Sequence, residues 1–418
     1  MKVYFETYGC ALNKGDTYSM MSLLRERNHE IVETLEGADV VVINTCAVRM
    51  ETEEKMKKRI RELSKTGKKL VIAGCLTGAQ PGLVSSLSPS SSMIGPQSIS
   101  DIVKVVESNE RVISLDSKTP SILPRVFDGL ISVIPIEDGC AGNCNFCITK
   151  LARRNLRSYP LRNIVETVKR MISQGAKEIE LTGQDTAVYG LDMGGKVTLP
   201  DVVKEVASLE GDFMIRVGMM TPEMAMRHLD SILEAWENPK VYKFFHIPVQ
   251  SGNDKVLREM NRKYTVDEFR AIVKEIRKKF RLVNITTDII VGHPGEDDSA
   301  FEDTLNLMKE LRFERIHIAM YSIRPNTRSS MLAQVPGPIK KERLKRAVSL
   351  YEQLSREVHK EYLGRQMRVL ALERGKDDTI IGRTINYIPV ILSDAVLGNW
   401  YDVKIVDSSF FDLRGEIV

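Results

Sequence analysis

Three cysteines in the middle of the chain have a spacing that suits an iron–sulfur cluster. Cys140, Cys144 and Cys147 form a Cys-x-x-x-Cys-x-x-Cys array directly after an apolar segment. A structural zinc site is closed by four protein ligands, commonly from paired Cys-x-x-Cys motifs, whereas this array offers three thiolates at a different spacing. A [4Fe–4S] cluster held by three cysteines leaves one iron free for an outside ligand. We therefore expect such a cluster here, with a zinc site or a group of reduced cysteines as the alternative.

The other three cysteines are far apart in the sequence but occupy equivalent places. Cys10, Cys46 and Cys75 each follow directly after one of three strands predicted near the N-terminus. The carboxyl ends of consecutive parallel strands collect at one edge of a sheet, so we expect these thiols to converge. Gly9 and Gly74 precede two of them, and a residue without Cβ allows a tight turn against a cluster. We predict a second three-cysteine cluster whose free iron holds a sulfur species; ordinary buried cysteines are the alternative.

Alternating strands and helices must position the three N-terminal cysteines. The strands are VYFETYG, DVVVIN and KLVIAG, and helices are predicted over residues 16–27 and 51–65. Such alternation favours a parallel sheet covered by helices, because the crossovers are right-handed. We predict an N-terminal three-layer α/β domain over residues 1–115.

The remainder of the chain divides into two further predicted domains. Segments rich in Ser, Pro and Gly at residues 81–98 and 116–129 are predicted as loops or linkers, the second as a domain boundary. Six strand candidates separated by helical patterns then indicate a partial (β/α)6 barrel over residues 126–360. After a charged helix at residues 340–362, short strands without helices between them predict a small β-barrel over residues 361–418. The fold class is therefore α/β with a β-barrel at its end.

Composition narrows the class of protein. The 418 residues are 43% hydrophobic, which suffices for several cores, and the formal net charge of +4 neither requires nor excludes a nucleic-acid partner. Six cysteines are too few and too unevenly placed for a secreted disulfide scaffold. The sequence shows neither a signal peptide nor an apolar run approaching the roughly 20 residues that span a bilayer. We expect a cytoplasmic protein without a membrane partner.

The central array resembles the signature of the radical-SAM superfamily, Cys-x-x-x-Cys-x-aromatic-Cys, with Phe146 as the aromatic residue. The resemblance implies that the open iron binds the amino and carboxylate groups of S-adenosylmethionine (SAM). One electron from the reduced cluster would then cleave SAM to a 5′-deoxyadenosyl radical.

The order of the three predicted domains resembles that of the methylthiotransferases, whose C-terminal barrel is the RNA-binding TRAM module. Within this family, the segments ITKLARRNLRSYP, LTGQDTAVYGLD and HIPVQSGND are similar to the archaeal and eukaryotic branch. That branch converts N6-threonylcarbamoyladenosine (t6A) at position 37 of tRNA to its 2-methylthio derivative. The alternatives are methylthiolation of a ribosomal-protein aspartate and a non-enzymatic iron–sulfur protein that binds RNA.

The resemblance also implies roles for individual residues. All six cysteines would be catalytic and would ligate two [4Fe–4S] clusters. The candidates to contact SAM are the aromatic residue of the central array and four side chains at barrel strands: Phe146, Gln184, Gln250, Ser251 and Asp288. We expect His246 and His293, which also lie near strand ends, to be structural.

Basic side chains are the candidates for contacts with tRNA. Arg153, Arg154 and Arg157 follow the central array and could meet the phosphates of the anticodon stem-loop, although a solvated basic turn is the alternative. Further candidates lie in the TRAM-like segment: Arg365, Arg368, Arg383 and Trp400. The activity further implies an electron donor such as ferredoxin or flavodoxin and a sulfur donor, and we expect a monomer.

Overall fold

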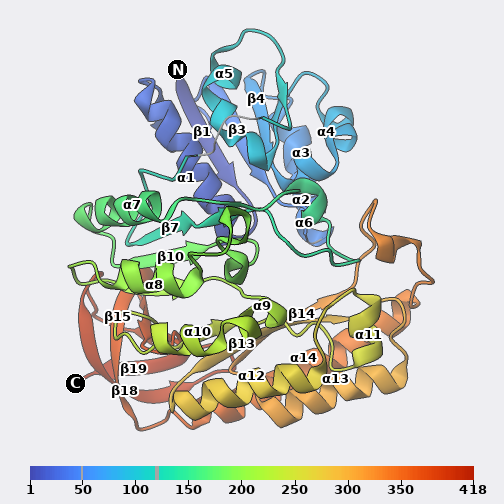
Figure 1. Ribbon diagram of the computed structural model, residues 1–418. Helices are drawn as coiled ribbons and strands as arrows, with labels where there is room; N and C mark the ends of the chain where they lie inside the picture. Colours follow the sequence, from blue (N-terminus) through green and yellow to red (C-terminus); the bar gives the residue numbers. More distant parts are fainter. Residues whose placement is uncertain (49, 118–121) are drawn as a thin grey trace.

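A six-stranded parallel sheet forms the N-terminal part of the chain in the computed structural model, which describes residues 1–48, 50–117 and 122–418 (Figure 1). Its strand order is β2-β1-β3-β4-β5-β6, so that the three strands preceding the cysteines are neighbours. The strands are β1 (Lys2–Thr7), β2 (Glu30–Val32), β3 (Val40–Thr45), β4 (Lys69–Gly74), β5 (Ser92–Ile94) and β6 (Ile113–Ser114).

Helices cover both faces of this sheet, which confirms the predicted three layers. Val42 and Val71 share one core with Met20 of helix α1 (Ala11–Glu26) and with α5 (Ile102–Glu107). On the other face, Ile43 and Ile60 share a core, Ile60 being on α2 (Met50–Leu63). Alternate strand residues point to opposite faces, so the continuous apolar strands β3 and β4 supply both cores.

One predicted loop in this region is wrong. Residues 81–98 contain helix α4 (Pro81–Leu87), strand β5 and the 3-10 helix η1 (Pro96–Asp101). Val84, Met93 and Ile94 are fully buried there, and packing of these side chains overrides the local preference of Ser, Gly and Pro for turns. Of the second predicted linker, residues 118–121 lie outside the described residues.

The central part is the predicted open barrel of six parallel strands. Strands β11-β10-β7 and β12-β13-β14 form two three-stranded sheets, which a bridge between Ile215 and Val241 joins. The strands are β7 (Ile131–Pro135), β10 (Glu178–Thr182), β11 (Met214–Val217), β12 (Phe244–His246), β13 (Asn284–Val291) and β14 (Arg315–Met320). All six coincide with strand candidates of the sequence. We call this open barrel the half-barrel.

Amphipathic helices pack on the outside of the half-barrel. They are α7 (Leu161–Ser173), α8 (Leu199–Ala207), α9 (Pro222–Arg227), α10 (Leu229–Ala235), α11 (Asp254–Glu259), α12 (Val266–Lys279) and α13 (Asp298–Leu311). Helix α12 shows why such segments fold locally. Thr265 and Glu268 form a reciprocal capping box at its start, and Phe269, Ile272 and Ile276 form a buried stripe at helical spacing.

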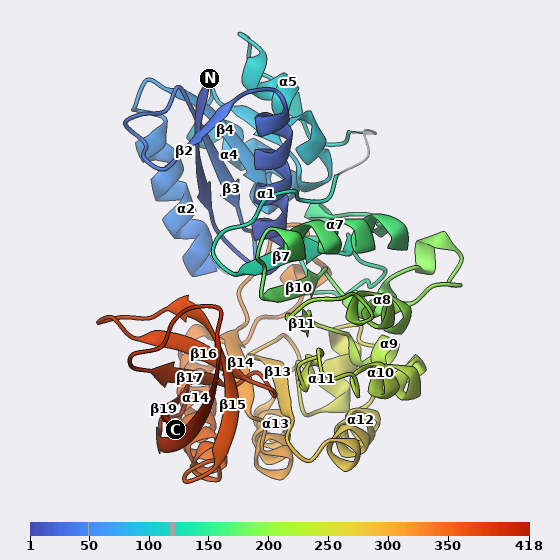
Figure 2. The same cartoon turned by 90° about the vertical axis from the view of Figure 1, so that its left-hand side faces the viewer.

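The long helix α14 (Gly337–Lys360) leads to a closed five-stranded barrel, as predicted. Its strands are β15 (Gln366–Arg374), β16 (Ile380–Thr384), β17 (Pro389–Leu392), β18 (Trp400–Ser408) and β19 (Leu413–Ile417). The barrel contacts the half-barrel where β10 begins, since the Tyr387 hydroxyl donates to Glu178 at 2.9 Å. Figure 2 shows the N-terminal sheet in blue and this barrel in red on different sides of the half-barrel. Among the described residues, no helix combines the length and apolarity needed to cross a membrane.

Candidate functional site

The three N-terminal cysteines converge at one edge of the sheet. Cys10 is the N-cap residue directly before α1, Cys46 follows β3, and Cys75 begins the short helix α3 (Cys75–Ala79). Gly9 has φ +115°, and a Cβ added to it would lie 2.9 Å from the Cβ of Cys46, so the chain passes too closely for any other residue. Burial is the main cause that raises the pKa of Cys75, and the thiols of Cys10 and Cys46 add to it, so all three lie near one another.

A buried asparagine, which the sequence did not single out, ties this edge together. The side chain of Asn13 donates to the carbonyls of Tyr8 and Thr45, both at 2.9 Å, and accepts from Cys75 Sγ at 3.6 Å. These contacts link the ends of β1, β3 and β4. Asn13 therefore orients the turns that carry the thiols.

The central cysteines lie in the loop between β8 (Glu137–Asp138) and the short helix α6 (Thr149–Ala152). A Cβ added to Gly142 would lie 3.3 Å from Cys140 Sγ and 4.0 Å from Cys144 Sγ, so these two sulfur atoms flank one point of the loop. Burial is the main cause that raises the pKa of Cys140, and the thiols of Cys147 and Cys144 add to it, so the three cysteines lie near one another.

Arg262 is a neighbour of this array that the sequence analysis missed. Its Nη1 donates to Cys144 Sγ at 3.1 Å, and its Nε donates to the hydroxyl of Tyr264 at 3.1 Å. Only 7% of Arg262 is exposed. A buried guanidinium bonded to sulfur stabilises negative charge on that sulfur.

The donor set fits iron–sulfur clusters. Burial raises the pKa of Cys75 and that of Cys140 to about 12, so each thiol holds its proton at neutral pH unless a metal displaces it. Two groups of three thiols are well suited to clusters with three protein ligands each. Cys10 is exposed whereas Cys46 and Cys75 are buried, so the N-terminal set opens on the side of Cys10.

The chain segments beside the two sets of cysteines pack together where α3 contacts α6. Cys75 shares a small buried core with Ile148 and Ala152, and Ile148 directly follows Cys147. A Cβ added to Gly78 would lie 3.0 Å from the carbonyl oxygen of Ala152, so the two short helices pack closely. The N-terminal domain thus places Cys75 beside the segment that follows the central array.

Arg153 lies at this junction, and the expectation that it contacts tRNA is wrong. Its side chain is fully buried, donates to Asp138 at 2.6 Å and to Asn13 at 3.1 Å, and is ion-paired with Asp16. Because Asp16 belongs to α1 and Asp138 to β8, Arg153 joins the N-terminal domain to the half-barrel. A guanidinium with two buried carboxylate partners has no access to phosphates.

A second buried arginine joins the two domains at another place. Arg324 follows β14, and its Nη1 lies 2.7 Å from an oxygen of Glu53 on α2. Its Nη2 donates to the carbonyl of Val48 at 2.7 Å, two residues after Cys46. This contact holds the chain beside Cys46 against the half-barrel.

The candidate SAM residues have different environments. Phe146 is half-buried, with its ring edge-on to His293 at 6.1 Å. Gln184 is half-buried after β10, and Gln250 has φ +68° and a side-chain oxygen that has no hydrogen-bond partner among the described residues. The structure does not support Ser251 as a contact to SAM, because its side chain is fully buried and its hydroxyl lies 3.5 Å from that of Thr304.

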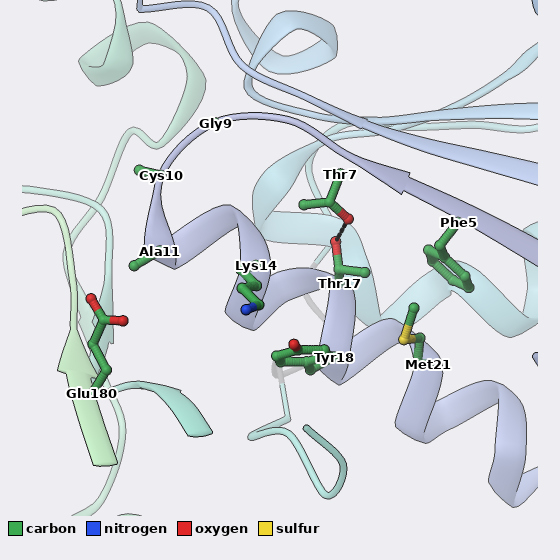
Figure 3. A pocket seen from close by; sticks show the side chains of 10 residues that line it. All are labelled: Phe5, Thr7, Gly9, Cys10, Ala11, Lys14, Thr17, Tyr18, Met21 and Glu180. Atoms are coloured by element: carbon green, nitrogen blue, oxygen red, sulfur yellow. Dashed lines mark hydrogen bonds between the residues drawn. The ribbon is translucent and has the colours of Figure 1, made fainter. Parts of the chain in front are cut away.

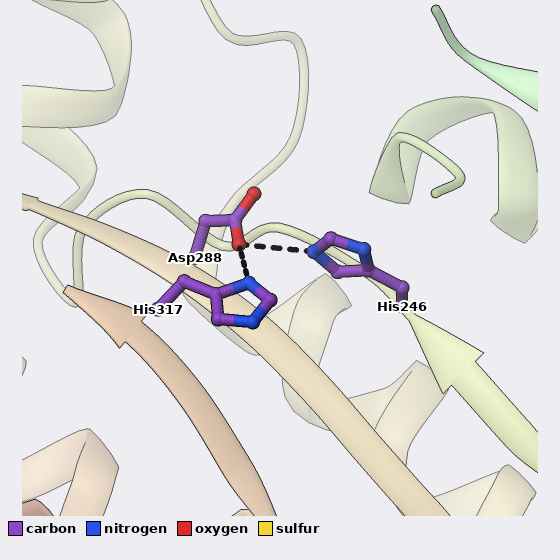
Figure 4. Close-up of side chains that lie close together, drawn as sticks. All are labelled: His246, Asp288 and His317. Atoms are coloured by element: carbon purple, nitrogen blue, oxygen red, sulfur yellow. Dashed lines mark hydrogen bonds and ion pairs between the residues drawn. The ribbon is translucent and has the colours of Figure 1, made fainter. Parts of the chain in front are cut away.

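Asp288 lies on the inner face of the half-barrel, but its carboxylate is engaged by two imidazoles, those of His246 and His317 (Figure 4). These imidazoles hold the pKa of Asp288 well below its usual range despite the burial of its carboxyl group. His293 is fully buried and bonded through both ring nitrogens, to Pro294 and Ser329, which agrees with a structural role.

The candidate RNA-binding residues are only partly at the surface. Arg154 and Arg365 are exposed, and Arg157 is half-buried. Arg383 is paired with Glu373 at 2.8 Å. The remaining two contact each other: the Arg368 guanidinium lies 5.1 Å from the ring of Trp400, whose indole donates to Asp212 of the half-barrel at 3.0 Å.

A cavity of about 460 Å³ opens beside Cys10. It is lined by residues of β1 and α1, including Lys14 and Tyr18, and by Glu180 from β10. Figure 3 shows Glu180 on its strand of the half-barrel and Cys10 and Lys14 on the separate segment that forms the turn and α1. The exposed cysteine of the N-terminal set therefore faces a space that reaches the half-barrel.

Comparison with known proteins gives matches along most of the chain. The model of the radical SAM superfamily matches residues 134–308, that of the TRAM domain residues 360–418, and that of the uncharacterized protein family UPF0004 residues 2–95. The chain is 40% identical over the full length of both proteins to the probable threonylcarbamoyladenosine tRNA methylthiotransferase of Pyrococcus horikoshii. It is 33% identical to the human threonylcarbamoyladenosine tRNA methylthiotransferase, over the whole of this chain and 74% of that protein.

Solved structures share the fold at low sequence identity. The radical S-adenosylmethionine methyltransferase TsrM from Kitasatospora setae matches with a TM-score of 0.55 and 11% identity, over 79% of this chain and 77% of that one. The cobalamin-dependent radical enzyme OxsB matches with a TM-score of 0.54, over 84% of this chain and 56% of that one. At such identity the likeness is one of fold alone.

Proposed function

The chain belongs to the family of threonylcarbamoyladenosine tRNA methylthiotransferases, and we propose that it replaces the hydrogen at C2 of t6A at position 37 of tRNA with a methylthio group. The enzyme class is that of the radical SAM enzymes, which implies one [4Fe–4S] cluster and SAM. The observation that carries the proposal is the packing of Cys75 against Ile148, which directly follows the central array, so that the segments bearing the two sets of cysteines lie together.

We assign Cys140, Cys144 and Cys147 to the cluster that binds SAM and the N-terminal set to a second [4Fe–4S] cluster. When bound, the first cluster supplies the electron that cleaves SAM, and the second carries the sulfur. Two clusters in neighbouring positions would suit a reaction in which the 5′-deoxyadenosyl radical takes the hydrogen atom from C2 on one side, and sulfur held on the other side then bonds to that carbon.

The residues of this chain would orient these groups and exclude water. Asn13 and Arg153 hold the turn of Cys75 beside the central array, and both are fully buried, so water is kept from this junction. The donor from Arg262 stabilises charge on Cys144. The cavity beside Cys10 gives a substrate base access to the exposed side of the N-terminal set.

Contacts with tRNA are proposed for the basic residues that are accessible, Arg154, Arg157 and Arg365. Phosphates of the anticodon stem-loop would bind there while the target base is extruded towards the cavity. We further propose that the chain divides into domains at residues 1–115, 126–360 and 361–418. We also propose that Phe146, Gln184 and Gln250 contact SAM, and that the protein is a cytoplasmic monomer. A ferredoxin- or flavodoxin-type electron donor and a separate sulfur donor complete the reaction.

Anaerobic reconstitution with iron and sulfide tests the proposal. The reduced enzyme should bind about eight irons per chain, cleave SAM to 5′-deoxyadenosine, and add a methylthio group to tRNA that contains t6A. Cys46→Ala should lose about half of the iron and all of the methylthio product while it still cleaves SAM, and Cys144→Ala should lose SAM cleavage. Mass spectrometry of the digested tRNA measures the product.

Two results would contradict these assignments. A Cys46→Ala variant that keeps its full iron content would exclude the N-terminal cluster. Methylthiolation of a ribosomal-protein aspartate, with no reaction of tRNA, would show that the assigned substrate is wrong, but it would not affect the assignment of the two clusters.

A further inference from the structure

Three polar side chains from neighbouring strands of the half-barrel meet on one face of the sheet. His246 ends β12, Asp288 lies within β13, and His317 lies within β14. Asp288 and His317 are direct partners in register, and His246 pairs with Thr286, two residues before Asp288. Because alternate residues of a strand share a face, all three side chains project to the same side, as Figure 4 shows.

This side is the inner face of the half-barrel. The residues adjacent in sequence, Phe245, Ile289 and Ile316, belong to the core that packs against the outer helices, and they are 0%, 0% and 4% exposed. The polar side chains therefore point away from the helices. Those of His246, Asp288 and His317 are 15%, 30% and 37% exposed, so a small ion can reach them.

The donor atoms have the separations of a ligand set. Asp288 Oδ1 lies 2.9 Å from His246 Nε2 and 2.9 Å from His317 Nδ1, and the three donors lie within 4.8 Å of one another. Ligand atoms at adjacent positions around one ion, each about 2.1 Å from it, lie about 3 Å apart, so the two separations from Asp288 suit a shared ion. Two imidazoles and one carboxylate are the set that binds divalent first-row metals with positions left open. Strands, unlike loops, hold such donors rigidly.

Nearby cationic groups are engaged elsewhere. Arg216 is paired with Glu180 and lies 5.0 Å from the ring of Phe244. Arg315, two residues before His317, has its guanidinium 4.5 Å from the ring of Phe411 in the C-terminal barrel. The carboxylate of Asp288 is thus partnered by the two imidazoles, which a metal ion converts from hydrogen-bond donors to ligands once they are deprotonated at the bonded nitrogen.

We propose that His246, Asp288 and His317 form a binding site for a divalent first-row transition-metal ion whose remaining coordination positions face the inside of the half-barrel. This site is separate from both cysteine sets and uses none of their ligands. An ion there orients oxygen donors, such as carboxylates, that enter the half-barrel. The site exists whether or not the proposed reaction on tRNA is correct.

Mn²⁺ is the probe for this site, because free Mn²⁺ gives a sharp paramagnetic resonance signal that weakens when the ion binds. Oxidised [4Fe–4S] clusters are diamagnetic and leave the signal clear. The titration uses reconstituted full-length enzyme without SAM or tRNA. We expect about one Mn²⁺ per chain, and competition by Zn²⁺.

Variants locate the bound ion. His317→Ala and Asp288→Asn, on different strands, should each weaken Mn²⁺ binding by about tenfold or more, while His228→Ala, at the junction of two outer helices, should bind as the wild type does. Thermal unfolding shows that each variant is folded. No stoichiometric binding to the wild-type enzyme would overturn the proposal, as would unchanged binding in either ligand variant or an equal loss in His228→Ala.

Discussion

Replacing Arg153 by methionine tests the interpretation that this residue joins two domains through buried ion pairs. The substitution keeps much of the side-chain volume but removes the charge that Asp16 and Asp138 share. Both carboxylates are nearly fully buried, at 5% exposure each. Removing one partner of a buried ion pair costs about 3–5 kcal/mol, because the remaining charge is left without compensation. For a unit of roughly 150–250 residues, this corresponds to a fall in Tm of about 6–20 °C.

The loss of Tm in Arg153→Met should also depend on pH, in a direction that follows from the pKa of Asp16. Burial already raises the pKa of Asp16 to about 6 in the folded protein, and the guanidinium of Arg153 opposes this rise. In the Arg153→Met variant the pKa of Asp16 in the folded protein rises further above its value in the unfolded chain. The free energy of unfolding of the variant is therefore kept at pH values where Asp16 is protonated, and it falls as the pH rises through the folded-state pKa. The loss of Tm in Arg153→Met should therefore be larger at pH 8 than at pH 6.

Circular dichroism of thermal unfolding at both pH values measures the effect, with Arg154→Met as the matched control. The Arg154 side chain is 60% exposed and lies 3.9 Å from Asp116, so its removal should cost less than about 1 kcal/mol. Equal Tm values for the two variants would refute the buried connection. So would a larger loss at pH 6 than at pH 8.

Three further results are expected. Arg262→Met removes the donor to Cys144 and should make the reduction potential of that cluster more negative, which a redox titration followed by electron paramagnetic resonance measures; an unchanged potential would contradict the role of the bond. Gly9→Ala forces a Cβ against Cys46 at φ +115° and should cost about 1–3 kcal/mol and lower the iron content from about eight to about four, whereas full iron content would show that the turn adapts. Arg154→Ala should weaken tRNA binding and reduce the salt slope by about 0.9, and identical slopes would exclude a phosphate contact.

Most of the fold follows from local pattern. The alternation of apolar strands and amphipathic helices predicts the parallel N-terminal sheet, all six strands of the half-barrel and the closed C-terminal barrel. The loop predicted over residues 81–98 is wrong, because Val84, Met93 and Ile94 are buried by contacts that composition does not reveal. Likewise α1 starts at Ala11, where the turn after Gly9 ends, and not at residue 16.

The cysteines of the candidate site were predictable, because residue type, spacing and the order of strands along the chain are enough to identify them. The central array is a contiguous motif, so its spacing alone identifies the donors. The N-terminal cysteines follow three parallel strands, so strand order is enough to bring them to one edge. The sequence does not show which basic residues are buried, since Arg153 and Arg154 are neighbours in one basic segment but Arg153 is fully buried and Arg154 is exposed.

The six thiols, their places after strands and the order of the three domains are all visible in the amino-acid sequence, because they depend on local spacing and periodicity. The charged groups that act on those thiols become apparent from the packing of the folded chain. Arg262 reaches Cys144 across 118 positions of the chain, and Arg153 reaches Asp16 across 137. Such pairs arise from the packing of one domain on another and from the order of strands in the half-barrel. Buried charges are stable only with partners, so packing decides where each one lies.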